Sequence, residues 1–117
     1  MTGDVTDTSA LVWLRAEPGS RVALQYGTQP SLTEYSSANV VTVDSESDYT
    51  AKISLDQLQP GTRYYYRAEV ARRMPGTIGS FVTAPRADDD AKVTFCFSAD
   101  TRESYKPFTV MNAVRAQ

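Results

Sequence analysis

Hydrophobic and polar residues alternate in short runs along the first 84 residues, and turn-forming residues separate these runs. A period of two is typical of a strand that buries one face, and no run in this part has the 3.6-residue period of an amphipathic helix. The pattern predicts an all-β sandwich of six to seven strands, the seventh being a short strand near Val5. The six longer predicted strands span residues 9–16, 21–26, 39–43, 49–55, 63–72 and 78–83.

The pattern changes after the last of these strands. Residues 87–91 contain three consecutive aspartates and predict an acidic, solvated linker. Residues 92–98 form a nearly continuous apolar run, which is typical of a strand buried on both faces of a parallel sheet. From Pro107 the apolar residues recur at helical spacing, so we expect a helix to begin there.

A strand, a polar loop and a helix make half of a βαβ unit. We therefore expect two parts, a sandwich over residues 1–86 and the truncated beginning of a larger α/β domain over residues 92–117. We also expect part of the first strand of the sandwich to be missing. The alternative is a natural C-terminal helix that packs on the sandwich.

Composition excludes several classes of function. The chain has 12 Lys and Arg against 14 Asp and Glu, a net charge of −2, which argues against binding of nucleic acid. No apolar run approaches the roughly 20 residues of a membrane-spanning helix, and no signal-peptide pattern follows Met1. The single Cys excludes an internal disulfide, and the absence of His removes the usual metal ligand and general base. We therefore expect no catalysis by these 117 residues alone.

The segment Leu58-Gln59-Pro60-Gly61-Thr62-Arg63-Tyr64 resembles the signature of fibronectin type III domains. The resemblance implies that Tyr64 forms a tyrosine corner, with its ring buried and its hydroxyl bonded to the backbone. Trp13 matches the core Trp of that family, which implies that Leu11 and Trp13 point inward. The core residues expected on these grounds are Trp13, Leu24, Ile53, Leu58, Tyr64 and Tyr66.

This register would place Val12 and Leu14 on the outer face of the second strand. Two apolar residues on an outer face have two interpretations. They mark a surface that another domain covers, or they are the isolated exposed apolar residues found on most proteins.

Residues 3–15 resemble the opening of the N-terminal domain of alkaline phosphatase D, in which a Gly-Asp, a short polar turn and an apolar pair precede a Trp. Purple acid phosphatases carry a similar domain. In both families the sandwich leads into a calcineurin-like metallophosphoesterase domain whose first strand ends in a metal-binding Asp. Asp100, at the end of Phe95-Cys96-Phe97-Ser98-Ala99-Asp100, fits that position.

The resemblance implies that Asp100 is a metal ligand in the parent protein, since a carboxylate is a suitable ligand for a hard cation. From position alone, Asp100 is equally compatible with a turn Asp that caps local amides. Many family members have a second ligand, a His, two residues later, but this chain has Arg102 there. Arg102 is either a weak candidate for binding the substrate phosphate or a surface residue.

The function implied by the resemblance is that of a non-catalytic N-terminal domain in a secreted metal-dependent phosphatase or phosphodiesterase. Such a parent hydrolyses phosphate esters with a divalent metal pair, which activates water and stabilises the leaving oxygen. The partner of this sandwich would be its own C-terminal catalytic domain. The alternative is a free-standing fibronectin type III-like module for adhesion or glycan binding.

Overall fold

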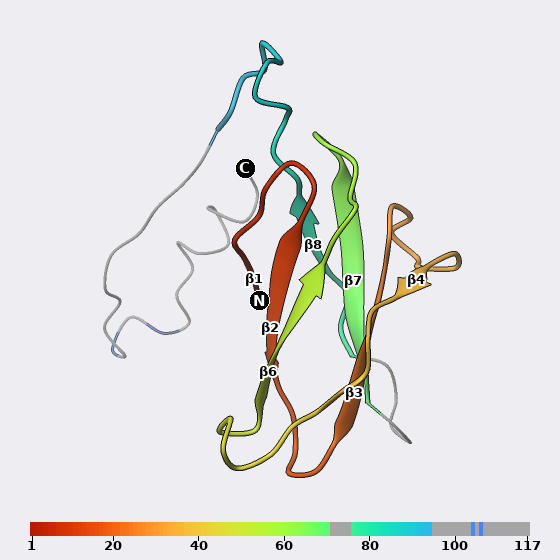
Figure 1. Cartoon of the computed structure of the whole chain (residues 1–117), viewed down its shortest axis with the longest axis vertical. Coiled ribbons are helices and arrows are strands. Elements are labelled where there is room, and N and C mark those ends of the chain that lie inside the picture. Colours follow the sequence, from red (N-terminus) through yellow and green to blue (C-terminus); the bar gives the residue numbers. More distant parts are fainter. Residues whose placement is uncertain (71–75, 95–103, 105, 107–117) are drawn as a thin grey trace.

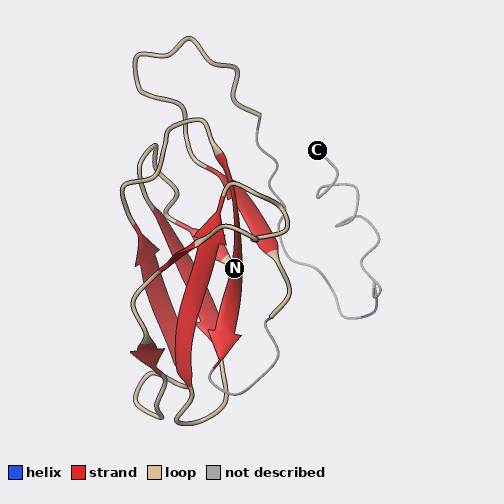
Figure 2. Cartoon of the chain, turned by 90° about the vertical axis from the view of Figure 1, so that its right-hand side faces the viewer, coloured by secondary structure: helices blue, strands red, loops and turns tan. Residues whose placement is uncertain are grey.

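The computed structural model describes residues 1–70, 76–94, 104 and 106 of the chain. In this part eight strands form two antiparallel sheets that lie face to face (Figures 1 and 2). The predicted all-β sandwich is therefore confirmed. The strands are β1 (Thr2–Gly3), β2 (Ala10–Arg15), β3 (Arg21–Gly27), β4 (Ser36–Ser37), β5 (Val41–Thr42), β6 (Thr50–Leu55), β7 (Arg63–Val70) and β8 (Gly79–Val82).

The first sheet has the order β1-β2-β6, and the second has the order β4-β3-β7-β8 with β5 also paired to β3. All six longer strands predicted from the sequence are present with shifted ends. The predicted short strand lies at Thr2–Gly3, before Val5, and β4 was not predicted because it consists of two exposed serines. The centre of the sandwich is formed by the long pairings β2–β6 and β3–β7.

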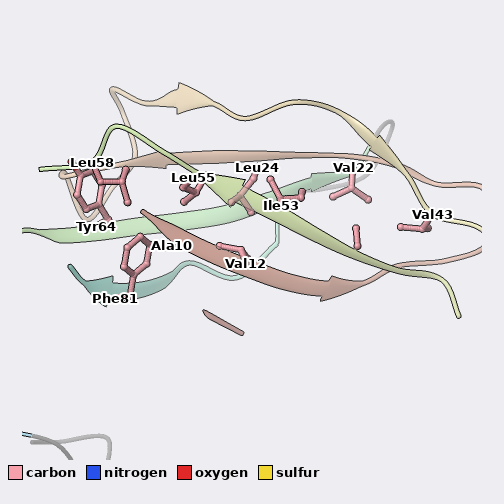
Figure 3. Close-up of a cluster of buried hydrophobic side chains, with 11 residues drawn as sticks. Ala10, Val12, Val22, Leu24, Val43, Ile53, Leu55, Leu58, Tyr64 and Phe81 are labelled. Carbon is pink, nitrogen blue, oxygen red and sulfur yellow. The ribbon is translucent and has the colours of Figure 1, made fainter. Parts of the chain in front are cut away.

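The core lies between the two sheets and is continuous along the sandwich (Figure 3). Four of the predicted core residues, Leu24, Ile53, Leu58 and Tyr64, are buried as expected. Tyr66 is only partly buried, and its ring packs against Phe81 with 6.1 Å between the ring centroids. The buried cluster consists of Ala10, Val12, Val22, Leu24, Val43, Ala51, Ile53, Leu55, Leu58, Tyr64 and Phe81.

The prediction that Trp13 belongs to the core is wrong. Its side chain is 38% exposed, whereas Val12 is only 1% exposed and Leu14 packs against the core. The inward and outward faces of β2 are therefore the reverse of those expected. The interpretation of Val12 and Leu14 as a covered outer surface is wrong for the same reason.

Pairing with β6 explains the register of β2. Val12 lies opposite Ile53, and Leu14 lies opposite Ala51. Residues directly opposite each other in an antiparallel pair point to the same face. Because Ile53 and Ala51 point into the core, Val12 and Leu14 also point inward. Trp13 lies opposite the exposed Lys52 and shares its outward face.

Only the first three residues of the predicted strand over residues 92–98 are described. Residues 92–94 have no regular secondary structure and are exposed. The strand over residues 92–98 as a whole therefore stays a prediction. The rest of that segment and the expected helix from Pro107 lie outside the described residues.

Candidate functional site

The two residues predicted to take part in phosphate-ester chemistry, Asp100 and Arg102, lie outside the described residues. Their roles therefore stay predictions. The described part of the chain offers four structured surfaces on the sandwich. These are the corner where the chain leaves it, a polar groove, the outer face of the second sheet and an apolar hollow at one edge.

The corner is built around Tyr64, as the sequence predicts. Its ring stacks on Phe81 with 5.7 Å between the centroids, and its hydroxyl accepts a hydrogen bond of 3.0 Å from the backbone N–H of Gln59. This is the bond expected of a tyrosine corner. It satisfies a partly buried donor that would otherwise have lost its contact with water.

Thr83 holds the residues at which the chain leaves the corner. Its buried hydroxyl donates to the carbonyl of Gln59 at 2.6 Å and accepts from the N–H of Thr62 at 2.8 Å. The next residue, Ala84, donates its N–H to the carbonyl of Thr6 at 3.0 Å. The chain therefore leaves the sandwich at a fixed point beside the loop that follows β1.

Tyr64→Phe is expected to lower the free energy of unfolding by about 1–2 kcal/mol, because the N–H of Gln59 loses its acceptor. Urea denaturation of the 117-residue chain measures the change. Tyr35→Phe is the matched control, since Tyr35 is an exposed tyrosine and its substitution is expected to change stability by less than about 0.5 kcal/mol. Equal urea midpoints for Tyr64→Phe and the wild type would contradict the role of this hydroxyl.

A polar groove of 520 Å³ lies between the loop after β3 and the turn after β6. Its lining includes three tyrosines and two carboxylates: Tyr26, Tyr35, Tyr64, Glu34 and Asp56. Such groups can bind a polar ligand through hydrogen bonds and ring contacts. The sequence pattern did not predict this groove, because its residues come from separate segments of the chain.

The middle of the outer face of the second sheet carries a network of bonded polar side chains. Arg67 donates from Nε to Oε1 of Gln25 at 2.6 Å, and Gln25 donates from Nε2 to Oε2 of Glu69 at 2.8 Å. Gln25 is buried beneath these charged neighbours. The network satisfies the amide of Gln25 on both sides.

An apolar hollow of 270 Å³ lies at one edge of the sandwich, between β1 and β2 of the first sheet and β7 and β8 of the second. The buried residues Val12 and Leu24 contribute to its lining, and the exposed residues Met1, Trp13 and Ile78 also line it.

Tyr66 also lines the hollow. Burial raises the pKa of its hydroxyl above the usual value of 10.0, against a smaller lowering by a hydrogen bond with the side chain of Thr2. Burial therefore favours the neutral form of the Tyr66 hydroxyl.

No group of three or more His, Cys, Asp or Glu side chains that could hold a metal ion occurs among the described residues. The described residues also include no helix with the length and apolar character required to cross a membrane.

The sequence matches the family described as PhoD-like phosphatase, N-terminal domain, over residues 1–85. The chain belongs to this family. The resemblance to the N-terminal domain of alkaline phosphatase D is therefore confirmed, and the match includes all eight described strands. Comparison with curated proteins found no significant match.

Solved structures with the same fold include PhoD itself, with a TM-score of 0.63 and 18% identity over 72% of this chain. The alignment covers 18% of the PhoD chain, so the present chain spans less than a fifth of that relative. A human fibronectin type III domain from the KIAA0970 protein has a TM-score of 0.60 and 13% identity, over 87% of this chain and 82% of that one.

The sensor domain of the anti-sigma factor RsgI4 from Pseudobacteroides cellulosolvens has a TM-score of 0.59 and 14% identity, over 91% of this chain and 92% of that one. At such identities the likeness to all three structures shows the fold alone. It confirms the fibronectin type III-like architecture of the sandwich.

Proposed function

We propose that this chain is the non-catalytic N-terminal domain of a metal-dependent phosphatase or phosphodiesterase that hydrolyses phosphate esters. The observation that carries the proposal is the family match over residues 1–85. The sequence contains no His, and the described residues supply no cluster of metal ligands. Both features fit a domain that supports chemistry performed elsewhere in the same polypeptide.

The catalytic domain of this parent begins within residues 92–117, and its divalent metal pair is held by that domain. Asp100 is the first ligand, at the end of an apolar segment, and Arg102 contacts the phosphate of the substrate. The support for these assignments is the resemblance of residues 92–102 to the first strand of metallophosphoesterase domains. The same resemblance supports an extracytoplasmic or secreted parent, which cell fractionation with an antibody against the sandwich would test.

The 117-residue chain is expected to have no phosphatase or phosphodiesterase activity, whereas the full-length protein hydrolyses phosphate esters. Both are assayed with 4-nitrophenyl phosphate and bis(4-nitrophenyl) phosphate, before and after treatment with EDTA. The full-length protein is expected to lose activity on chelation, because its catalysis needs metal ions. Turnover by the short chain that survives further chromatography would contradict a non-catalytic role, and an inactive full-length protein would contradict the proposed parent.

A second candidate is a fibronectin-like module that binds glycans. The polar groove favours it, because Tyr35 is 49% exposed there beside the carboxylates of Glu34 and Asp56. Binding of oligosaccharides to the 117-residue chain, measured by calorimetry and lost in Tyr35→Ala, would support this candidate. The family match disfavours it, since the matched domains are parts of phosphatases.

A further inference from the structure

The chain leaves the sandwich between two loops that hold it on both sides. The N–H of Ala84 donates to the carbonyl of Thr6 at 3.0 Å, and the carbonyl of Ala84 accepts from the N–H of Gly61 at 2.9 Å. The two loops are themselves joined, because the N–H of Leu58 donates to the carbonyl of Thr8 at 2.9 Å. Both backbone groups of Ala84 are therefore fixed, and the segment after it starts at this end of the sandwich.

Three loops form this end, and their charges are of one sign. Residues 4–9, 28–35 and 56–62 connect strands there, and Figure 1 shows all three loops at the upper end of the sandwich, where the chain departs after β8. These three loops are named here the exit end. They contain no Lys or Arg and four carboxylates, those of Asp4, Asp7, Glu34 and Asp56. Within the described part of the chain, none of these four carboxylates takes part in an ion pair.

The polar groove opens at the exit end. Glu34 and Asp56 come from two of its loops, and both residues are exposed beside Tyr35, with no basic residue among the described residues of the lining. Each loop is anchored by a buried leucine, Leu32 in one and Leu58 in the other, so the groove is formed before anything binds. Carboxylates beside an aromatic ring suit the ammonium or guanidinium group of a Lys or Arg side chain.

The charge balance of the sequence reverses after the acidic linker. Residues 1–91 contain 8 Lys and Arg against 12 Asp and Glu, whereas residues 92–117 contain 4 Lys and Arg against 2 Asp and Glu. The net charge is therefore −4 in the first part and +2 in the second. Residues 85–91 extend at most about 25 Å, so a segment of opposite charge begins close to the exit end.

We propose that the exit end is the docking surface for the catalytic domain of the same polypeptide, an inference that rests on the proposed function. A Lys or Arg side chain of that domain enters the polar groove between Glu34 and Asp56. Exposed ion pairs are individually weak, but a short linker gives two joined domains a high effective concentration. Charge complementarity between the groove and the incoming side chain fixes which surface of the catalytic domain faces the sandwich.

Labelling of carboxylates with glycine ethyl ester and a carbodiimide, measured by mass spectrometry, tests the proposal in the full-length protein and in the 117-residue chain. Glu34 and Asp56 are expected to be labelled about fivefold more slowly in the full-length protein, because a docked surface excludes solvent and reagent. Glu46 is the matched control, an exposed glutamate in the loop between β5 and β6 at the other end of the sandwich (Figure 1). Its labelling rate is expected to be equal in both proteins.

Reversing one charge in the groove tests whether electrostatic attraction holds the two domains together. In the full-length Glu34→Lys variant, Asp56 is expected to be labelled as fast as in the 117-residue chain, because the new ammonium group repels a basic side chain in the groove. Glu34 is an exposed loop residue, so its replacement preserves the sandwich. Glu46→Lys is the matched variant and is expected to leave the slow labelling of Asp56 unchanged.

Equal labelling of Asp56 in the two wild-type proteins, equal protection of Asp56 and Glu46, or protection of Asp56 that survives Glu34→Lys would overturn the docking surface. Protection that increases with protein concentration would also overturn it, because a second copy of the protein would then cover the groove. Any of these results in a full-length protein that hydrolyses phosphate esters would leave the proposed function intact. Protection that is lost in Glu34→Lys, in a full-length protein without that activity, would support docking of the following domain and overturn the proposed function.

Discussion

Replacing Asp100 by Ala in the full-length protein is expected to lower kcat about a thousandfold and to reduce the bound metal. A lost carboxylate ligand removes both a negative charge and a coordination point, and a metal centre contributes several kcal/mol of transition-state stabilisation. The sandwich is expected to stay folded, because its hydrogen bonds and core are made within residues 1–84. Elemental analysis and steady-state kinetics measure the two effects.

Arg102→Ala is the matched variant, two residues further along the chain. If Arg102 binds the substrate phosphate, its loss raises KM and leaves the metal content unchanged, because a guanidinium contributes hydrogen bonds to phosphate but no metal coordination. Full metal content together with a near-normal kcat in Asp100→Ala would show that Asp100 is a turn residue. The link between residues 92–102 and phosphate-ester chemistry would then be lost.

The parts of the fold that the sequence predicts correctly are those encoded by neighbouring residues. The alternation of Ala51, Ile53 and Leu55 is regular, and all three are buried. The tyrosine corner follows from the short segment between Leu58 and Tyr64, since the hydroxyl of Tyr64 reaches an N–H only five positions away. In both cases the local pattern and the tertiary contacts favour the same arrangement.

The register of β2 was predicted wrongly because its own sequence contains no alternation. Residues 10–14 are all apolar, so either face is compatible with burial. The size of Trp13 and its match to a core Trp favoured the wrong face. The deciding information lies some 40 residues away, in β6, and enters only when the two strands pair.

The polar groove could not be predicted because it depends on how a loop folds back onto β3. Gly27 permits this close approach, since a Cβ there would lie 2.8 Å from the carbonyl oxygen of Glu34. Leu32 anchors the same loop by burying its side chain, with a positive φ of 50°. A loop rich in polar residues gives no periodic signal for such an arrangement.

The corrected register leads to a prediction of stability that separates the two candidate cores. In the 117-residue chain, Leu24→Ala is expected to lower the free energy of unfolding by about 3 kcal/mol, because Leu24 is fully buried and its truncation leaves a cavity. Trp13→Ala is expected to cost about 1 kcal/mol, since Trp13 lies on the outer face and part of its ring is already in water.

Urea denaturation followed by far-UV circular dichroism measures both changes, because the loss of Trp13 removes the tryptophan fluorescence of the chain. A cost of about 3 kcal/mol is a large share of the 5–15 kcal/mol that stabilises a typical domain, so Leu24→Ala brings the sandwich close to unfolding. If Trp13→Ala lowered the free energy of unfolding as much as Leu24→Ala, the result would indicate that Trp13 points into the core. It would contradict the pairing of Val12 with Ile53.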